Sequence, residues 1–346
     1  MSKSVNERIL ISVCAATALG AGVLVLAPAV VGQTKLSGTA SAWSAPKTPW
    51  GEPDIQGLWP TTEWKGVPLQ RSPSLGTRNV LTEDEFAARE KQAASEAASD
   101  AEEFKATDAP IGENPPEYWQ DRGKPKTQAS LLVEPANGRL PPLTPEAQER
   151  MAARAAAKKM HGPADSWTDR SLYERCIMRR EMNFMPTLYN NGHQILQTKG
   201  YVVIRHEMIN ETRIVPIGDR PFTSIRTYVG ESRGHWDGDT LVVETKNFPA
   251  SGAFINVTRD DPVPVSDSLR VIERFTRTGD HTLAYEKTVD DPKTWTQPWK
   301  VAFEITEDPT YPLYEYACHE GNYGLVNILK GARAAERAVQ KSKGTL

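Results

Sequence analysis

Short runs of alternating apolar and polar residues dominate the second half of the chain, from Gln194 onward. β-Branched and aromatic residues gather in these runs, and turn-forming residues separate them, which is the pattern of an antiparallel meander. In the last run Trp299, Val301, Phe303 and Ile305 alternate with polar or small neighbours, so one side of that strand is predicted to be buried and the other wet. The predicted strands are residues 201–207, 212–216, 225–230, 240–248, 269–278, 282–289 and 299–306.

Strands of this number and spacing are enough to close or nearly close a barrel. The pairs Asp237-Gly238 and Gly279-Asp280 are hairpin-turn signals between them. Upstream, the Gly-x-Trp that ends at Trp59 resembles the first-strand signature of lipocalin-like barrels, where the tryptophan packs across the barrel floor. The alternative is a tryptophan that covers one end of another kind of core. The predicted fold class is therefore mainly β, an antiparallel lipocalin-like barrel or curved sheet with peripheral N-terminal and C-terminal helices.

Helical patterns lie on both sides of the predicted sheet. Thr82 followed by Glu85 forms a capping box, and Thr144 followed by Pro145 places an N-cap before a proline at the first helical position. Seven prolines between positions 109 and 142 exclude regular helix or central strand there and predict an extended arm. The predicted helices cover residues 82–104, 144–160 and 325–340.

Three segments follow from these patterns. Residues 1–33 carry Lys3 and Arg8 ahead of a long apolar run, which predicts an export signal; the length of the run leaves an uncleaved N-terminal anchor open. Residues 34–165 are expected to form a helical and proline-rich wrap, with a first strand near 55–59. Residues 166–346 are expected to form the antiparallel β domain with its C-terminal helix. The predicted location is periplasmic or secreted.

Composition limits the class of partner. The chain has 346 residues, of which 39% are hydrophobic, so it can fill one large core or two modest ones. A net charge of -3 and a pI near 6.1 argue against nucleic acid as a partner. The expected partner is a small molecule, and contact with a membrane is expected only through the N-terminal anchor. The oligomeric state is left open.

The cysteines predict one disulfide. Cys14 lies in the apolar N-terminal segment, which leaves Cys176 and Cys318 as the plausible pair. Export makes such a bond chemically allowed, and the bond would bracket the sheet region. The alternative is two unpaired buried thiols.

Three stretches resemble the motifs of a family of exported bacterial proteins with no assigned activity. They are PDIQGLW from Pro53, GHWDGDTLVVETKNF from Gly234 and YEYACHEGNYG from Tyr314. The resemblance covers most of the chain after Pro53. It implies export and a β-rich fold, and it contributes no catalytic residue.

Known catalytic and cofactor motifs are missing from the sequence. His206-Glu207 and His319-Glu320 are adjacent pairs, whose side chains point to opposite faces of a strand and cannot hold one ion by themselves. The sequence has no HExxH, no paired CxxC, no Gly-x-Ser-x-Gly, no GxGxxG and no P-loop. No metal or other cofactor is predicted, although a zinc site assembled from distant histidines stays open.

The strongest candidate site lies near the C-terminus. Residues 313–329 combine a cysteine, a histidine, carboxylates and three tyrosines, and His319 and Glu320 are the candidate catalytic residues there. His235, beside a predicted turn, is a third candidate at the mouth of the barrel. For each histidine the alternative is a capping or packing role.

Glu273 is the fourth candidate, because strand parity places it on an apolar face with Val271 and Phe275. Desolvation there is expected to raise the pKa of Glu273 and suit it to proton transfer. The alternative is that Glu273 returns to water or pairs with an arginine.

The function predicted from these residues is binding of a small, largely apolar or aromatic molecule in a β-barrel pocket. Acid/base chemistry of the lyase, isomerase or hydrolase type would follow from the carboxylates and histidines. The alternative is a non-catalytic ligand carrier or an envelope structural protein. An enzyme is expected to gather His319, Glu320, His235 and Glu273 around one cavity, a carrier to have an apolar cavity, and a structural protein to have none.

Overall fold

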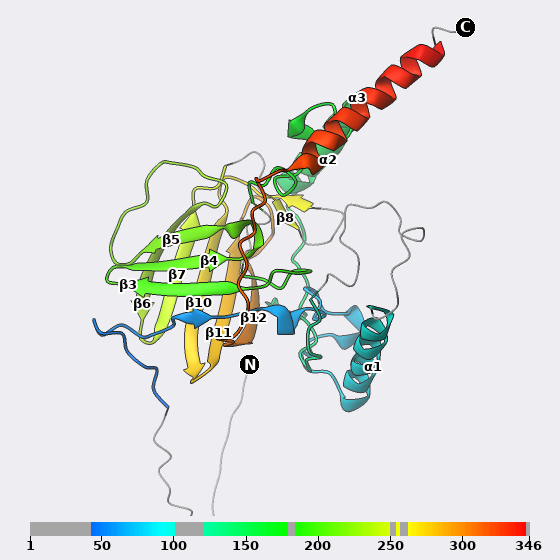
Figure 1. The fold of residues 1–346 in the computed structure, drawn as a ribbon. Coiled ribbons are helices and arrows are strands. Elements are labelled where there is room, and N and C mark those ends of the chain that lie inside the picture. Colours follow the sequence, from blue (N-terminus) through cyan, green and yellow to red (C-terminus); the bar gives the residue numbers. More distant parts are fainter. Residues whose placement is uncertain (1–42, 101–120, 179–183, 250–253, 257–261, 344–346) are drawn as a thin grey trace, which may run out of the picture. The chain divides into compact units, whose positions relative to one another are not determined.

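The strands form two antiparallel sheets that pack face to face (Figure 1). The computed structural model describes residues 43–100, 121–178, 184–249, 254–256 and 262–343. The predicted export signal and part of the proline-rich arm lie outside these residues. Residues 43–346 form one compact unit, and the segment before position 166 contributes one strand to each sheet.

The smaller sheet has the order β1-β3-β4-β5 and the larger one β2-β12-β11-β10-β7-β6. The strands of the smaller sheet are β1 (Gly57–Leu58), β3 (His193–Thr198), β4 (Tyr201–His206) and β5 (Thr212–Pro216). Those of the larger sheet are β2 (Leu132–Glu134), β6 (Glu231–Asp237), β7 (Thr240–Lys246), β10 (Arg270–Gly279), β11 (Thr282–Asp290) and β12 (Trp299–Thr306). A separate pair joins β8 (Phe254–Asn256) to β9 (Pro262–Pro264).

The core lies between the two sheets and follows from the alternation in the sequence. Buried and partly exposed residues alternate along all of β11, and β12 buries every second residue from Trp299 to Ile305 as predicted. Ile195 and Ile204 of the smaller sheet belong to the same buried cluster as Phe275 of the larger one. The two sheets therefore share one hydrophobic core.

Two links join the edges of the sheets without closing a barrel. Ile217, just after β5, forms a parallel bridge with Gly234 of β6. On the opposite side, the amide of Asp308, which follows β12, donates to the carbonyl of Leu58 of β1 over 3.0 Å. Neither sheet closes on itself among the described strands. The prediction of a mainly β, antiparallel fold is confirmed, and the curved-sheet form of that prediction fits these two open sheets better than a closed lipocalin-like barrel.

The predicted Gly-x-Trp feature sits at β1. Trp59 is fully buried, and its indole Nε1 donates to the carbonyl of Ile55 over 3.0 Å. Gly57 has a φ of 150°, and a Cβ atom there would lie 2.7 Å from Oε1 of Glu307 and 3.1 Å from the Trp59 indole. Glycine is required at this position because the tryptophan folds back against the backbone. The guanidinium of Arg277 lies 5.7 Å from the centre of the Trp59 ring.

Some strands were predicted in the wrong place or not at all. The strand predicted at 225–230 is a loop, and Ile225 there is 66% exposed. β3 and β6 were not predicted. β6 carries Glu231, Arg233 and His235 on one face and Ser232, Gly234 and Trp236 on the other, so Trp236 is its single large apolar residue and the apolar alternation that identifies a strand is missing.

The three longer helices match the predicted ones. They are α1 (Glu83–Asp100), α2 (Pro145–Met160) and α3 (Tyr323–Lys343). The predicted capping box is formed, because Thr82 Oγ1 accepts from the Glu85 amide and Glu85 Oε2 accepts from the Thr82 amide. Thr144 Oγ1 caps α2 by accepting from the amide of Ala147. Short 3-10 turns occur at Thr62–Trp64, Pro73–Leu75, Trp167–Asp169 and Met208–Asn210. None of the helices in the described residues is long and apolar enough to cross a membrane.

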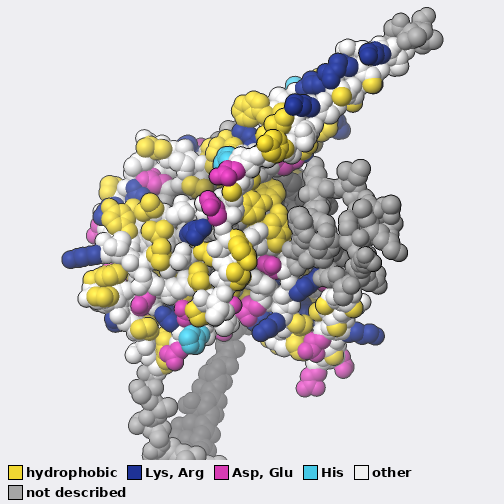
Figure 2. Space-filling model, in the orientation of Figure 1, with side chains coloured by type: hydrophobic (Ala, Val, Ile, Leu, Met, Phe, Trp, Pro, Cys, Tyr) yellow, Lys and Arg dark blue, Asp and Glu magenta, His cyan; other side chains and the backbone are white. Residues whose placement is uncertain are grey.

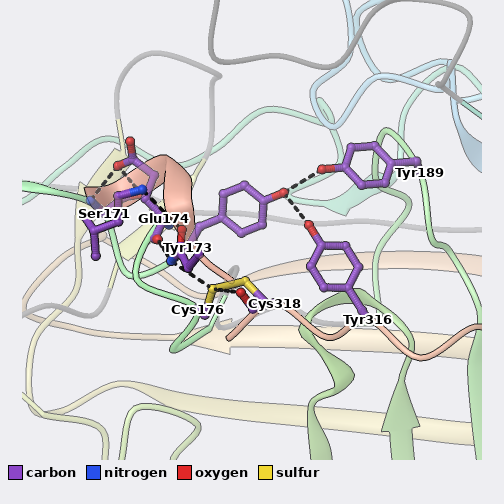
Figure 3. Close-up of a disulfide and its surroundings, with 9 residues drawn as sticks. Ser171, Tyr173, Glu174, Cys176, Tyr189, Tyr316 and Cys318 are labelled. Atoms are coloured by element: carbon purple, nitrogen blue, oxygen red, sulfur yellow. Dashed lines mark hydrogen bonds between the residues drawn. A yellow bond between two sulfur atoms is a disulfide. The ribbon is translucent and has the colours of Figure 1, made fainter. Parts of the chain in front are cut away.

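A disulfide between Cys176 and Cys318 confirms the predicted pairing (Figure 3). The two Cα atoms are 5.5 Å apart, and the bond joins positions 142 residues apart in the chain. Beside it, the hydroxyl of Tyr173 lies 2.6 Å from that of Tyr189 and 3.1 Å from that of Tyr316. The disulfide and these hydroxyls hold the segment after β12 against the segment before β3.

We predict that replacing both Cys176 and Cys318 by Ser lowers the free energy of unfolding by about 4 kcal/mol, because the bond closes a long loop in the unfolded chain. Chemical denaturation measures this loss. Cys14→Ser is the control and should leave the unfolding midpoint unchanged. Thiol labelling of the unreduced, denatured wild type should modify neither Cys176 nor Cys318, and labelling of both would contradict the pairing.

Candidate functional site

Ionisable side chains face the core from both sheets. In the larger sheet, Glu273 of β10 lies directly opposite Lys287 of β11, and each is 1% exposed. The alternation that buries Phe275 and Tyr285 also turns these two charged residues inward. Removing a charge from water costs several kcal/mol unless a partner compensates it. Partners for this cluster come from the smaller sheet as well.

Arg213 of β5 joins the two sheets by binding Glu273. Its Nη1 donates to Oε2 over 2.5 Å and its Nη2 to Oε1 over 3.2 Å. Tyr285 also donates to Glu273, from its hydroxyl to Oε1 over 2.8 Å. Because this geometry is bidentate, it fixes the position of the guanidinium as well as its charge.

The pairing reverses the expected titration of Glu273. Burial by itself would raise the pKa of this carboxyl group, but the positive charges of Arg213 and Lys287 and the hydrogen bonds from Arg213 and Tyr285 lower it to about 2. The prediction of a raised pKa was wrong, because Glu273 does pair with an arginine, and that arginine comes from the opposite sheet. At neutral pH Glu273 is therefore an ionised anchor rather than a proton carrier.

Two histidines lie against this cluster. His193 of β3 and His206 of β4 are paired in register, and their Nδ1 atoms are 2.8 Å apart. Phe184 stacks on the His193 ring with 4.3 Å between ring centres. Burial, reinforced by the charges of Arg213 and Lys287, lowers the pKa of His193 to about 3. Burial likewise holds the pKa of His206 well below its usual value, so both rings are neutral at neutral pH.

The histidine pair is anchored on one side only. Thr61 Oγ1 lies 3.2 Å from Nε2 of His193. The corresponding Nε2 of His206 is buried and has no hydrogen-bond partner among the described residues. A buried polar atom without a partner is uncommon and marks a place where a small polar group would be stabilised.

Glu211 has the raised pKa that was expected of Glu273. The amide of His206 donates to the carbonyl of Glu211 over 2.8 Å, which extends the β4–β5 ladder and turns the Glu211 side chain to the same side as Arg213. Burial raises the pKa of Glu211 to about 7, with a smaller contribution from Glu273, and the positive charges of Arg213 and Lys287 only partly offset this. Glu211 therefore exists in both protonation states near neutral pH.

A pocket opens beside Glu211 and Arg213. It holds about 280 Å³ of empty space when the solvent at its mouth is included, and its enclosed part has room for about one water molecule. The described residues that line it are Met178, Glu211, Arg213, Val229, Thr245, Phe248 and Val271. Glu211 and Arg213 are the two charged residues in this set; Glu211 directly precedes β5, and Arg213 is two positions further along, within it.

The four candidates chosen from sequence do not meet around one cavity. Glu273 lies in the buried cluster. His235 is exposed on the outer face of β6, and His319 and Glu320 are exposed between the disulfide and α3. Their catalytic roles stay predictions, but these placements move the candidate site to the pocket beside β5.

Sequence reasoning missed five members of the buried cluster: His193, His206, Glu211, Arg213 and Lys287. The strand alternation that selected Glu273 could also have identified Lys287 as buried, because Lys287 alternates with Tyr285 and Val289 along β11. Arg213 could be found in the same way from its alternation with Val215.

His206 and Glu207 are adjacent in the chain but contact different partners. Glu207 is fully buried and accepts hydrogen bonds from Asn190 Nδ2, the Gly192 amide, the Tyr311 hydroxyl and the Tyr314 amide. Glu207 therefore fastens the segment after β12 to the smaller sheet. In the part of the chain that the structure describes, no three His, Cys, Asp or Glu residues are grouped to hold a metal ion.

No family model, curated protein or solved structure matches this chain. The resemblance to a family of exported bacterial proteins therefore stays a prediction. What the site does has to be argued from its own geometry and charge.

We predict that Glu273→Gln lowers the free energy of unfolding by about 3–5 kcal/mol, because it leaves Arg213 and Lys287 buried without the carboxylate between them. Urea denaturation measures the loss. Glu286→Gln on the other face of β11 is the matched control and should cost less than about 1 kcal/mol. Equal losses in the two variants would mean that the buried pair contributes nothing beyond a surface charge.

The pH dependence of stability gives a second prediction. The folded-state pKa of Glu273 lies below its ordinary value of 4.5, so its contribution is complete above that value and is lost as the pH falls toward about 2. The wild type should therefore lose more stability than Glu273→Gln between pH 5 and pH 2. Parallel stability curves for the two proteins over this range would contradict the lowered pKa.

Proposed function

We propose that this protein binds a small, largely apolar molecule in the pocket beside β5 and that Glu211 exchanges a proton with it. The observation that carries the proposal is the lining of the pocket. Two adjacent charged side chains, Glu211 and Arg213, face a space whose other described walls are apolar apart from Thr245. A few convergent polar groups in an apolar pocket are typical of ligand sites.

Glu211 is suited to proton transfer near neutral pH. Its pKa of about 7 lets it accept a proton in one molecule and donate one in the next. The pKa of Glu273 near 2 keeps that second carboxylate ionised at the same pH. Environment thus separates two carboxyl groups into a proton carrier and a fixed charge.

Arg213 supplies positive charge in a fixed position. Its two Nη atoms are occupied by Glu273, while its Nε is buried and has no hydrogen-bond partner among the described residues. An N–H group held in this way can donate to an oxygen atom that becomes negative when the ligand loses a proton. The chemistry that fits is proton transfer of the lyase, isomerase or hydrolase type.

The walls restrict the ligand to a small molecule. Val229, Phe248 and Val271 offer apolar contact, but the enclosed part of the pocket, with room for about one water molecule, is far smaller than the roughly 300–1,000 Å³ common for ligand sites. Most of the ligand would have to occupy the open mouth, since the enclosed part is small. A compact aromatic or aliphatic molecule with one oxygen-bearing group meets these limits.

Export and a lipocalin-like origin of the two sheets belong to the same proposal. Export is supported by the disulfide, because such bonds persist in oxidising compartments. A barrel opened into two sheets is supported by the edge links at Gly234 and Leu58 and by the packing of Trp59.

An envelope structural protein is the second candidate. It is favoured by the dense filling between the sheets, where Phe184, Phe275 and Tyr285 pack with ring centres 4.9–5.2 Å apart. Such a protein would have no ligand beside Glu211.

We predict that benzoate, used as a test ligand, binds the wild type more weakly as the pH rises through about 7, because ionised Glu211 repels its carboxylate. Saturation-transfer NMR and calorimetry measure the binding. In Glu211→Gln the affinity should be nearly independent of pH, while Glu304→Gln, which removes an exposed carboxylate from β12, should behave as the wild type.

Val229→Trp, which fills the pocket, should abolish benzoate binding. Binding that survives this change would place the ligand elsewhere. If benzoate, indole and cyclohexanone all fail to bind and native mass spectrometry finds no retained small molecule, the structural candidate is the better account.

A further inference from the structure

Helix α3 turns two different faces to its surroundings. Residues spaced three and four apart lie on one side of a helix, and here they form a stripe with an aromatic and an aliphatic residue at its start and basic residues after them. The members of this basic stripe are Tyr323, Val326, Lys330, Arg337 and Lys341, while Arg333 between them binds the chain before β3. Tyr323 is 73% exposed and Val326 is 44% exposed. The stripe therefore faces solvent.

The other side of α3 is more covered. Leu325, Ile328, Leu329 and Ala332 are half-buried. Contacts to the chain before β3 fix the rotation of the helix, since Asn322 Nδ2 donates to the carbonyl of Glu174 over 2.8 Å and Arg333 Nη1 to that of Asp165 over 2.7 Å. α3 is also the most amphipathic of the three helices. Its outward face is thus a fixed feature of the fold.

Charge is strongly segregated onto this helix. α3 contains five Lys or Arg residues and one acidic residue, Glu336, which gives it a net charge of 5 − 1 = +4. The whole chain carries −3, so the rest of the chain carries −3 − 4 = −7. Figure 2 shows the basic side chains in a row along the helix. An anionic surface would be attracted to α3 and repelled by most of the remaining protein.

We propose that the basic stripe docks α3 onto an anionic phospholipid surface. A straight helix of this length presents a row of about 30 Å, which suits a flat layer of headgroups. Lysine and arginine side chains reach lipid phosphates while their stems contact apolar groups, and tyrosine favours the boundary between headgroups and acyl chains. Tyr323 and Val326 distinguish this surface from a purely electrostatic one, because nucleic acid phosphates offer them no apolar layer.

The inference is independent of the pocket beside β5 and of the N-terminal segment. Each basic residue near an anionic membrane strengthens binding by about fivefold, so the stripe gives reversible attachment whose strength depends on salt. Docking through the basic stripe is expected to cover the lysines of α3 and to leave those of α2 in solvent.

The test uses the full chain with vesicles of phosphatidylcholine alone or mixed with phosphatidylglycerol. Acetylation of lysines, followed by mass spectrometry, should show Lys330 and Lys341 protected by the mixed vesicles only, with Lys158 and Lys159 of α2 reactive throughout. Cosedimentation should show the triple variant Lys330→Gln, Arg337→Gln and Lys341→Gln binding mixed vesicles at least about tenfold more weakly than the wild type.

A second triple variant is matched for charge. Lys158→Gln, Lys159→Gln and Lys199→Gln remove the same charge from exposed sites outside α3 and should bind as the wild type. Attachment through the N-terminal segment would be equal in all three proteins and would leave Lys330 reactive. The proposal is overturned if the α3 triple variant binds as well as the wild type, or if duplex DNA protects Lys330 and the mixed vesicles do not.

Discussion

The ion pair between Arg213 and Glu273 is the interaction on which the interior of this protein depends. It joins the two sheets through two hydrogen bonds, and it compensates charges that would otherwise be buried alone. By holding Glu273 ionised it gives Lys287 a carboxylate directly across the β10–β11 ladder. The same pair fixes the guanidinium of Arg213, a residue that lines the pocket and whose Nε is buried without a hydrogen-bond partner among the described residues. The hydrophobic core packs the two sheets together, and this pair fixes the positions of the charged groups within it.

That pair also explains why two carboxyl groups in one cluster titrate so differently. Glu273 receives direct hydrogen bonds from a cation and from Tyr285, which lower its pKa. Burial dominates at Glu211, whose pKa rises to about 7 although the same cations act on it. Charges and hydrogen bonds outweigh burial at Glu273, whereas burial outweighs the nearby charges at Glu211.

The sequence was informative where a pattern is local. Caps at Thr82 and Thr144 and the alternation along β11 and β12 predicted elements that the structure contains, since each depends on neighbouring residues. The disulfide could be predicted because only Cys176 and Cys318 lie outside the N-terminal segment, which leaves a single possible pairing. β6 was missed because Trp236 is its single large apolar residue, and its pairing with β7 decides its conformation.

The site was harder to predict than the fold. Parity placed Glu273 on the buried face, but its pKa depends on Arg213, which lies 60 residues away in the chain and reaches it from another sheet. Local crowding of reactive residues favoured His319 and Glu320, which the fold leaves exposed. A search for charged residues on otherwise apolar strand faces would have found Arg213 and Lys287 together. Which of them pair is set by sheet packing, and no local pattern encodes it.

The most direct test of this account is the pKa of the Glu211 carboxyl group, measured by ¹³C NMR titration of the folded protein and assigned with Glu211→Gln. The account predicts a midpoint of about 7 for Glu211, while the Glu273 signal stays that of an ionised carboxylate down to about pH 2. A Glu211 midpoint near the ordinary value of 4.5 would contradict it, since Glu211 would then be a permanent anion at neutral pH and no longer suited to proton transfer.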